Sequence, residues 1–261
     1  MKKLISIILF VCISESIYAQ ELAVMPNDTS LNDQNTSENL TNNTAETKIV
    51  AFPRFRIALG GGLGYRLAVI SPDITDEFLR NYIRQLKLGY QFYAEATAYF
   101  NSYVGLGVRA NVFRASHTEY DVFTSDETGN TIYIGEMSDN TTTLFVAPAF
   151  SARFIQRKRD NALVMSAAIG YMRYWDKAVF TTPLSILGHT IGVSYDIGYD
   201  FRLNDFLLLG LNGGFTYGLL SEVKESYASQ TVTRVLEQPE SLLRVDISAG
   251  IRFSKNPGRY R

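Results

Sequence analysis

The sequence contains almost no cysteine, histidine or tryptophan: of 261 residues, one is Cys, two are His and one is Trp. The only cysteine, Cys12, lies in an apolar run near the N-terminus, so the remainder has no thiolate or disulfide chemistry. With so few ligand side chains and no ligand spacing, we expect no metal and no cofactor. Lys and Arg (25) nearly cancel Asp and Glu (26), which argues against nucleic-acid binding.

Long apolar runs are also missing. Residues 4–13 form a short apolar run after Lys2 and Lys3, and Ala19 offers a small residue for cleavage, so we predict a signal peptide over residues 1–19. No later segment reaches the roughly 18 apolar residues of a transmembrane helix. An exported chain of this kind is either soluble outside the inner membrane or a membrane barrel.

The chain divides by composition into a leader and a larger domain. Residues 20–50 are rich in Asn, Thr and Ser and poor in aromatics, which predicts a flexible periplasmic leader. Residues 51–253 form the predicted barrel, and residues 254–261 form a short C-terminal tail.

Apolar and polar residues alternate in eight segments, as in HTIGVSYDIGYDFRL at residues 189–203. A period of two is typical of a strand with two unlike faces. The predicted strands are 54–68, 88–100, 103–115, 143–155, 162–174, 187–203, 206–219 and 242–253. Short polar connections alternate strictly with long ones, as in transmembrane barrels. The sequence therefore predicts an all-β fold, an eight-stranded antiparallel up-and-down transmembrane β-barrel.

Charges and glycines indicate which face points inward. Eleven charged residues share the polar parity of their strands, and we predict that they form a charge network in the lumen: Arg56, Arg66, Glu95, Arg109, Arg153, Asp196, Asp200, Arg202, Arg244, Asp246 and Arg252. Glycines crowd the same face, which suits a barrel barely wide enough for its side chains. Aromatic rings gather at both ends of the apolar face, as in membrane girdles. A soluble barrel with an apolar interior is the alternative.

On these segments, the chain resembles the small eight-stranded outer-membrane barrels of OmpA/OmpX type and the wider group of outer-membrane β-barrel domains. The last strand, RVDISAGIRF, is similar to the C-terminal signal of such proteins, with Gly250 and Phe253, although further residues follow it. The resemblance implies the outer membrane as location. It also implies contact with outer-membrane lipid and lipopolysaccharide, and with the barrel assembly machinery during biogenesis.

Two long connections have distinctive composition. The connection 116–142 is predicted to be an acidic extracellular loop, with Glu119, Asp121, Asp126, Glu127, Glu136 and Asp139. It is a candidate site for divalent cations or a basic partner, although a solvated acidic loop is the simpler interpretation. Residues 74–87 have near-helical apolar spacing, which predicts a short helix over the barrel mouth, with Arg80, Arg84 and Lys87 as candidates for lipopolysaccharide phosphates.

Three functions remain open. The first is a non-enzymatic envelope scaffold, or a barrel whose long loops bind an unknown protein partner. The second is a narrow pore, which would prefer anions because the lumen charges have an excess of Arg. The third is a lipid A-modifying enzyme. His189 is the best catalytic candidate, but Ser194 lies on the opposite parity and no carboxylate shares its face, so we predict no enzyme.

Overall fold

Nine strands and one short helix make up the described part of the chain. The computed structural model describes residues 52–68, 76–125, 131–156, 160–180, 182–227 and 230–255, with the backbone alone at 123–125, 131–134, 180, 182 and 227. The predicted signal peptide (1–19) and leader (20–50) lie outside these residues, as does the tail beyond residue 255.

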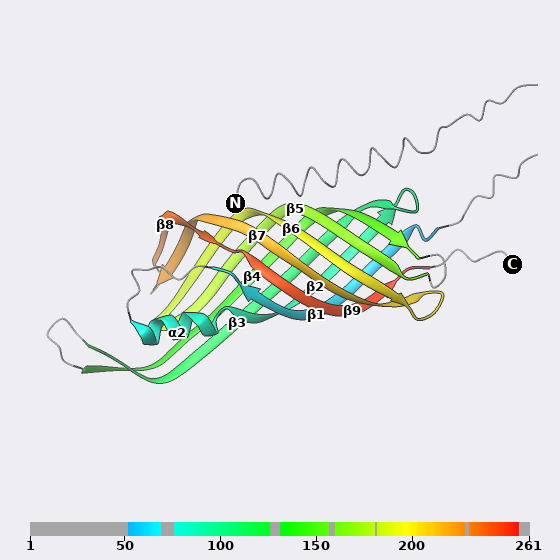
Figure 1. Cartoon of the computed structure of the whole chain (residues 1–261). Coiled ribbons are helices and arrows are strands. Elements are labelled where there is room, and N and C mark those ends of the chain that lie inside the picture. Colours follow the sequence, from blue (N-terminus) through cyan, green and yellow to red (C-terminus); the bar gives the residue numbers. More distant parts are fainter. Residues whose placement is uncertain are drawn as a thin grey trace, which may run out of the picture. The chain divides into compact units, whose positions relative to one another are not determined.

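The strands follow one another along the chain with a single helix between the first two (Figure 1). Their bounds are β1 (Phe55–Arg66), β2 (Leu88–Tyr99), β3 (Val104–Ser125), β4 (Thr131–Ile155), β5 (Ala162–Phe180), β6 (Thr182–Arg202), β7 (Leu207–Tyr227), β8 (Gln230–Ser241) and β9 (Arg244–Phe253). The helix is α2 (Glu77–Gln85), inside the segment where the sequence predicted one. All eight predicted strands are confirmed, and β8 is an additional one.

Eight of the strands close into a ring. The sheet order is β6-β5-β4-β3-β2-β1-β9-β7-β8, and a further pairing of β6 with β7 completes the circle without β8. Every pair is antiparallel. The predicted eight-stranded up-and-down barrel is therefore confirmed, and a closed ring leaves no backbone edge unpaired in lipid.

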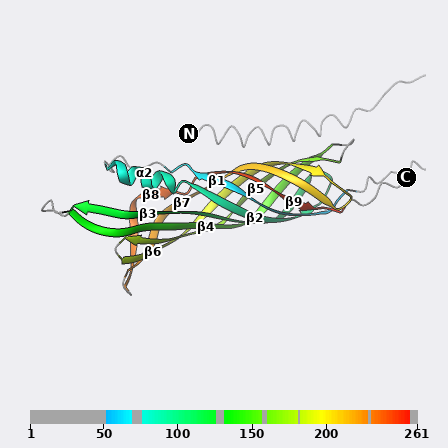
Figure 2. The ribbon, with the colours of Figure 1, turned by 90° about the horizontal axis from the view of Figure 1, so that it is seen from below.

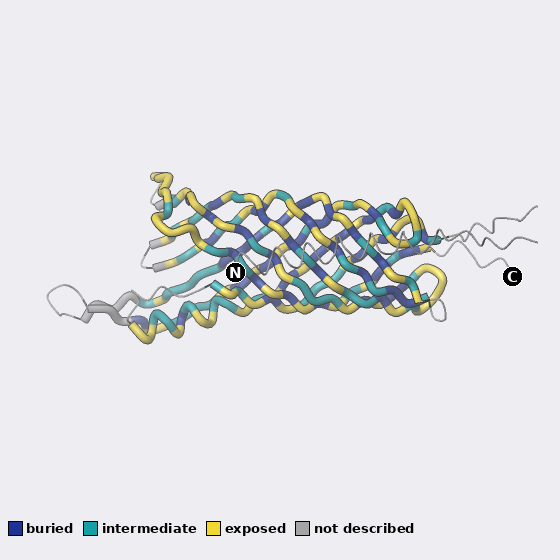
Figure 3. Tube along the Cα trace, turned by 45° about the horizontal axis from the view of Figure 1, so that its top comes forward, coloured by how far each residue is buried: buried dark blue, intermediate teal, exposed yellow. Residues whose placement is uncertain are grey.

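The outside of the ring is apolar and its inside is polar. Ile191 and Ile247 on the outer face are 72% and 78% exposed, whereas Arg56 and Glu95 on the inner face are 5% and 3% exposed. Buried and exposed positions alternate along the strands, as Figure 3 shows. An apolar surface this continuous is stable only in hydrocarbon, so the barrel spans a membrane. No helix in the described residues is long and apolar enough to do so.

Exposed rings lie at both ends of the apolar face, as predicted. Phe55, Phe100 and Phe154 stand near the short turns and are 70%, 67% and 54% exposed. Tyr90 and Tyr171 stand near the long connections and are 44% and 46% exposed. Such rings anchor a barrel at the two membrane interfaces.

Glycine allows the strands of the ring to close around an interior that is filled with side chains. A Cβ atom on Gly62 of β1 would lie 2.0 Å from the Ile247 carbonyl oxygen of β9, so the seam of the ring requires glycine there. A Cβ atom on Gly210 would lie 2.5 Å from the Arg252 guanidinium carbon. Glycine opposite arginine thus relieves crowding in the lumen, as the sequence suggested.

Three of the four predicted long loops are wrong in their upper parts, because the strands continue. The part of the sheet that extends past the ring is called the crown. It consists of residues 115–125 of β3, 131–141 of β4, 175–180 of β5, 182–187 of β6, 220–227 of β7 and all of β8. The ring ends near Arg114, the last β3 residue paired with β2. Figure 2 shows the long β3–β4 hairpin and α2 at this end.

We expect Leu209→Arg to destabilise the barrel by about 2–4 kcal/mol, because it places a charge in hydrocarbon. Leu209 is 43% exposed on the outer face. Urea unfolding of the purified chain in lipid vesicles measures the effect, and Leu209→Met serves as the control with little change. Equal midpoints for the two variants would contradict the outward orientation of this side chain.

Candidate functional site

The centre of the lumen is a cluster of buried ion pairs around Glu95 of β2. Its carboxylate accepts from Arg56 of β1 at 2.9 Å and from Arg109 of β3 at 3.0 Å. Thr97 adds a hydrogen bond to the same carboxylate at 3.2 Å. Glu95 therefore joins three adjacent strands from inside the ring.

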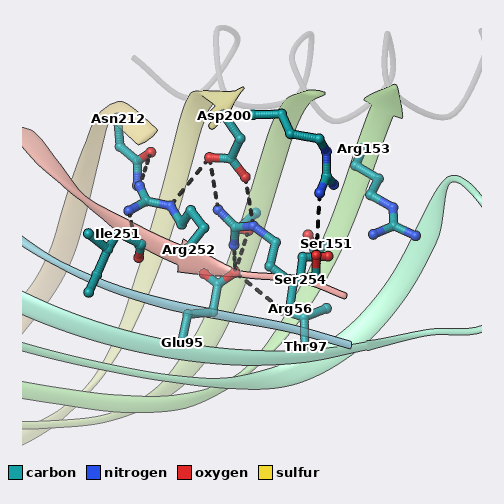
Figure 4. Close-up of polar contacts among 12 residues, drawn as sticks. Arg56, Glu95, Thr97, Ser151, Arg153, Asp200, Asn212, Ile251, Arg252 and Ser254 are labelled. Atoms are coloured by element: carbon teal, nitrogen blue, oxygen red, sulfur yellow. Dashed lines mark hydrogen bonds and ion pairs between the residues drawn. The ribbon is translucent and has the colours of Figure 1, made fainter. Parts of the chain in front are cut away.

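Two carboxylates from β6 close the cluster on its far side, and Figure 4 shows one of them, Asp200. The Asp200 carboxylate accepts a hydrogen bond from Arg56 Nε at 2.9 Å and lies 3.3 Å from Arg252 Nε of β9. Asp196 receives Arg109 Nη2 at 2.7 Å. Because β6 lies across the ring from β1 to β3, these contacts brace opposite walls and fill the space between them.

A neighbouring ion pair lies toward the crown. Arg244 Nε of β9 is 2.8 Å from Asp246, and Arg244 Nη2 donates to the Asn111 side-chain oxygen at 2.7 Å. Asn111 in turn donates to Gln91. The Arg244 guanidinium lies over the Phe113 ring, 4.7 Å from its centroid.

The predicted network left out the neutral side chains of Tyr93, Gln91 and Asn111. Arg252 Nη2 donates to Asn212 at 2.8 Å, and Asn212 donates to the Tyr93 hydroxyl at 2.9 Å. Gln91 and Asn111 are buried, at 2% and 3% exposure. The signal was present, since Tyr93 and Gln91 share the parity of Glu95 on β2, and Asn111 shares that of Arg109 on β3.

Three of the eleven predicted network residues lie outside this central cluster. Arg66 is at the crown end and pairs with Glu240 of β8 at 3.2 Å. Arg153 and Arg202 are at the short-turn end, where both donate to backbone carbonyls. The Arg153 guanidinium also lies 3.5 Å from the centroid of the Tyr99 ring. The other eight residues lie in the ion pairs described above.

Apolar side chains fill the interior where the ring meets the crown. Phe145 of β4, Met172 of β5 and Leu220 of β7 are each 1% exposed or less. They belong to one buried cluster that also contains Leu242. A charged layer and an apolar layer therefore follow one another along the axis.

The predicted acidic loop is wrong as a loop, because most of its acidic residues lie in paired strands. Glu119 and Asp121 are in β3, and Glu136 and Asp139 are in β4, where alternating Thr, Tyr and Val favour strand. Asp126 and Glu127 lie outside the described residues. The described residues contain no group of three or more acids and histidines placed to hold a metal ion.

Helix α2 rests on the crown through one buried side chain. Asp76 caps the helix by accepting from the Phe78 amide at 2.9 Å. Tyr82, 2% exposed, packs edge-on against His117 of β3 with ring centroids 5.2 Å apart. His117 Nε2 lies 2.9 Å from Glu119. The helix thus covers the edge of β3 that no longer has β2 as partner.

The pKa values of two carboxylates in the crown are raised. Burial raises the pKa of Asp139, and the charge of Asp176 raises it further, while a hydrogen bond from Tyr82 opposes the shift. Burial also raises the pKa of Asp176, against hydrogen bonds from Thr141 and Tyr174. Both carboxylates thus bind protons more tightly in the folded crown than in the unfolded chain.

The catalytic candidate His189 faces outward near the crown. Its Nδ1 is hydrogen-bonded to the Tyr171 hydroxyl, and the two rings are stacked with centroids 5.7 Å apart. Ser194 points inward instead and donates to Asp196 at 2.9 Å. The structure therefore does not bring His189 and Ser194 together.

Comparisons with known proteins give structural likeness only. No protein-family model matches the chain, and no curated protein does either. Among solved structures, a major outer membrane protein from Thermus thermophilus has a TM-score of 0.48 and 12% identity, covering 77% of this chain and 98% of that one. The outer membrane protease OmpT from Escherichia coli has a TM-score of 0.47 and 7% identity, covering 77% and 96%. Neisserial surface protein A has a TM-score of 0.43 and 10% identity, covering 76% and 96%.

The architecture itself rests on this chain's own geometry. A closed eight-stranded ring with an apolar outer belt, aromatic girdles and an ion-paired interior is the construction of outer-membrane barrels. The chain therefore folds as a transmembrane β-barrel of the outer-membrane type.

We expect Glu95→Gln to cost about 3–5 kcal/mol, because it leaves Arg56 and Arg109 buried without their shared carboxylate. The matched control is Glu240→Gln, which breaks the pair with Arg66 at a side chain 50% exposed and should cost no more than about 1 kcal/mol. Urea unfolding in lipid measures both. Similar costs for the two variants would show that the lumen pairs do not brace the ring.

We expect the crown to lose stability as pH rises. Since the folded-state pKa values of Asp139 and Asp176 are raised, the stabilisation is complete below the ordinary carboxyl pKa of about 4 and is lost as pH rises through the raised values. Hydrogen exchange of β3 and β4 amides, corrected for intrinsic rates, should show falling protection across this range.

Asp176→Asn should flatten this dependence, because it removes one titrating group and the charge acting on Asp139. Asp121→Asn, on an exposed residue of the β3–β4 hairpin, should leave the dependence unchanged. Identical pH profiles in the wild type and in Asp176→Asn would refute the assignment.

Proposed function

We propose that this chain is a non-enzymatic barrel whose sealed, rigid ring holds the crown at the cell surface for interaction with other molecules. The observation that carries the proposal is the continuation of β3 to β7 beyond the ring as paired strands. Hydrogen-bonded hairpins hold their side chains in place better than loops do, so they suit recognition.

The filled lumen supports a role outside the barrel rather than through it. Ion pairs cross the ring at its centre, and Phe145, Met172 and Leu220 pack above them. A continuous water path would have to displace both layers. The alternative function, a narrow pore, draws support only from the uncompensated Arg153 and Arg202 at one mouth, which would make any leak prefer anions.

The separation of His189 from Ser194 supports the absence of lipid A chemistry. An ester-cleaving site needs its nucleophile within hydrogen-bond reach of its base. Here the two side chains stand on opposite faces of β6.

Outward cations at the base of the crown are candidates for lipopolysaccharide contact. Arg114 and Arg173 are exposed just beyond the apolar belt, with Lys177 on the same strand as Arg173. Arg173 lies over the ring of Trp175, 5.5 Å from its centroid, and Trp is typical of membrane interfaces. Phosphates of the outer leaflet are the proposed partners of these cations.

For biogenesis, the final strand ending at Phe253 is the proposed signal for the barrel assembly machinery.

We expect the purified chain to show no stepwise conductance in a planar bilayer, because both layers block the lumen. Glu95→Gln with Met172→Gly, which loosens each layer, serves as the positive comparison. Regular openings in the wild type would establish the pore alternative. If the chain does not modify lipid A, its expression should leave the masses of lipid A unchanged; altered masses would establish the enzyme alternative.

The crown itself is tested by replacing residues 117–139 with a two-residue Asn-Gly turn between the paired residues Ser116 and Asn140. The shortened barrel should still fold, as heat-modifiable gel migration reports. In a strain that lacks the protein, only the full chain should restore resistance to detergent. Full rescue by the shortened barrel would reject a role for this hairpin, and an envelope scaffold would then be the remaining non-enzymatic function.

A further inference from the structure

A pocket opens at the short-turn end of the barrel, away from the crown. Arg56, Arg153 and Arg202 line it together with Asp160, Asp200, Ser254 and several apolar residues. Its volume is about 20 Å³, enough for one or two water-sized groups. Only a small group can enter it.

Among the eleven predicted lumen charges, the arginines elsewhere in the barrel are matched by carboxylates, and those at this end are not. In the central network Arg56, Arg109, Arg244 and Arg252 are matched by equal numbers of carboxylates, namely Glu95, Asp196, Asp200 and Asp246. Arg66 has Glu240. Of the predicted lumen arginines, Arg153 and Arg202 are the ones for which the described residues supply no ion pair.

Backbone carbonyls accept hydrogen bonds from these two arginines, but among the described residues one guanidinium nitrogen of each arginine stays without an acceptor. Arg153, 3% exposed, donates through Nε to Ser102 at 3.0 Å and through Nη2 to Pro53. Arg202 reaches four carbonyls, of Asp160, Asn204, Asp205 and Ser254, at 3.3–3.5 Å, through Nε and Nη1. In the described part of the chain Nη1 of Arg153 and Nη2 of Arg202 make no hydrogen bond.

Asp160 and Asp200 bring two negative charges to the pocket wall against the three positive charges of Arg56, Arg153 and Arg202, so the wall keeps a net charge of +1. Asp200 already bridges Arg56 and Arg252, so its charge belongs to the central cluster. Figure 4 shows Arg153 standing beside this cluster, with no contact drawn between its guanidinium and Asp200 or Glu95. A buried cation without a counter-charge is unfavourable, and an anion in the pocket would relieve that cost.

We propose that this pocket binds one small oxyanion, a carboxylate or phosphate group, through the unused donors of Arg153 and Arg202. Guanidinium groups recognise such oxygens in a fixed, planar geometry. The group enters from the short-turn side, either as a free ion or as the end of a larger molecule. The site is independent of the crown, since the whole lumen separates them.

Isothermal titration of the folded full chain in detergent tests the site. Inorganic phosphate, acetate and a short peptide with a free C-terminal carboxylate are titrated at constant ionic strength in chloride. Saturable binding of the free ions alone points to a free ion as occupant. Additional, tighter binding of the peptide, lost when its C-terminus is amidated, points to a carboxylate carried on a larger molecule.

Arg202→Gln should weaken the binding about tenfold or more, because a charge-assisted hydrogen bond contributes at least that much. Its contacts are long, so the variant should fold; Arg153→Gln gives a second variant, checked by heat-modifiable migration. Arg66→Gln at the other end is the control and should bind as the wild type does. Absence of saturable binding in the wild type, or equal binding in Arg202→Gln and Arg66→Gln, would overturn the proposal.

Discussion

The hydrogen-bonded seam between β1 and β9 is the constraint on which the other features depend. In hydrocarbon an open sheet edge would leave backbone groups without partners, so the ring has to close. Closure with eight strands fixes a narrow interior, which side chains must fill. The requirement for glycine at Gly62 and Gly210 follows, because strands and guanidiniums approach there too closely for a Cβ atom.

A narrow interior then dictates how charge is arranged. Buried ions are tolerable when each has its counter-ion, and the cluster around Glu95 and Asp200 meets that condition by sharing carboxylates between arginines. Arg252 also donates to Asn212, which in turn donates to the Tyr93 hydroxyl. Strands far apart in the sequence are thereby braced across the lumen.

The alternation of residue types was enough to predict the ring, the inward parity of its charges and the helix, since each depends on local periodicity. It did not reveal partners, because contacts such as Arg56 with Asp200 join strands β1 and β6, which face each other across the lumen only in the closed ring. The crown was missed where periodicity fails: Asp121 has a positive φ of 57° at a bulge that shifts the register between Glu119 and Val122. β8 is exposed on most positions and contains Pro239, so it lacks a two-faced pattern.

The sealed axis separates two ends of opposite character. Toward the crown, Glu119, Asp139 and Asp176 gather around His117 and Tyr82, and burial makes the two aspartates hold protons more tightly. At the other mouth, Arg153 and Arg202 donate to backbone carbonyls, and Arg153 also lies over the Tyr99 ring. Because the matched pairs between them carry no net charge, the two ends do not neutralise each other through the barrel. We therefore expect each end to respond to a different partner: the crown takes up protons as pH falls, and the short-turn mouth is where we propose that an anion binds.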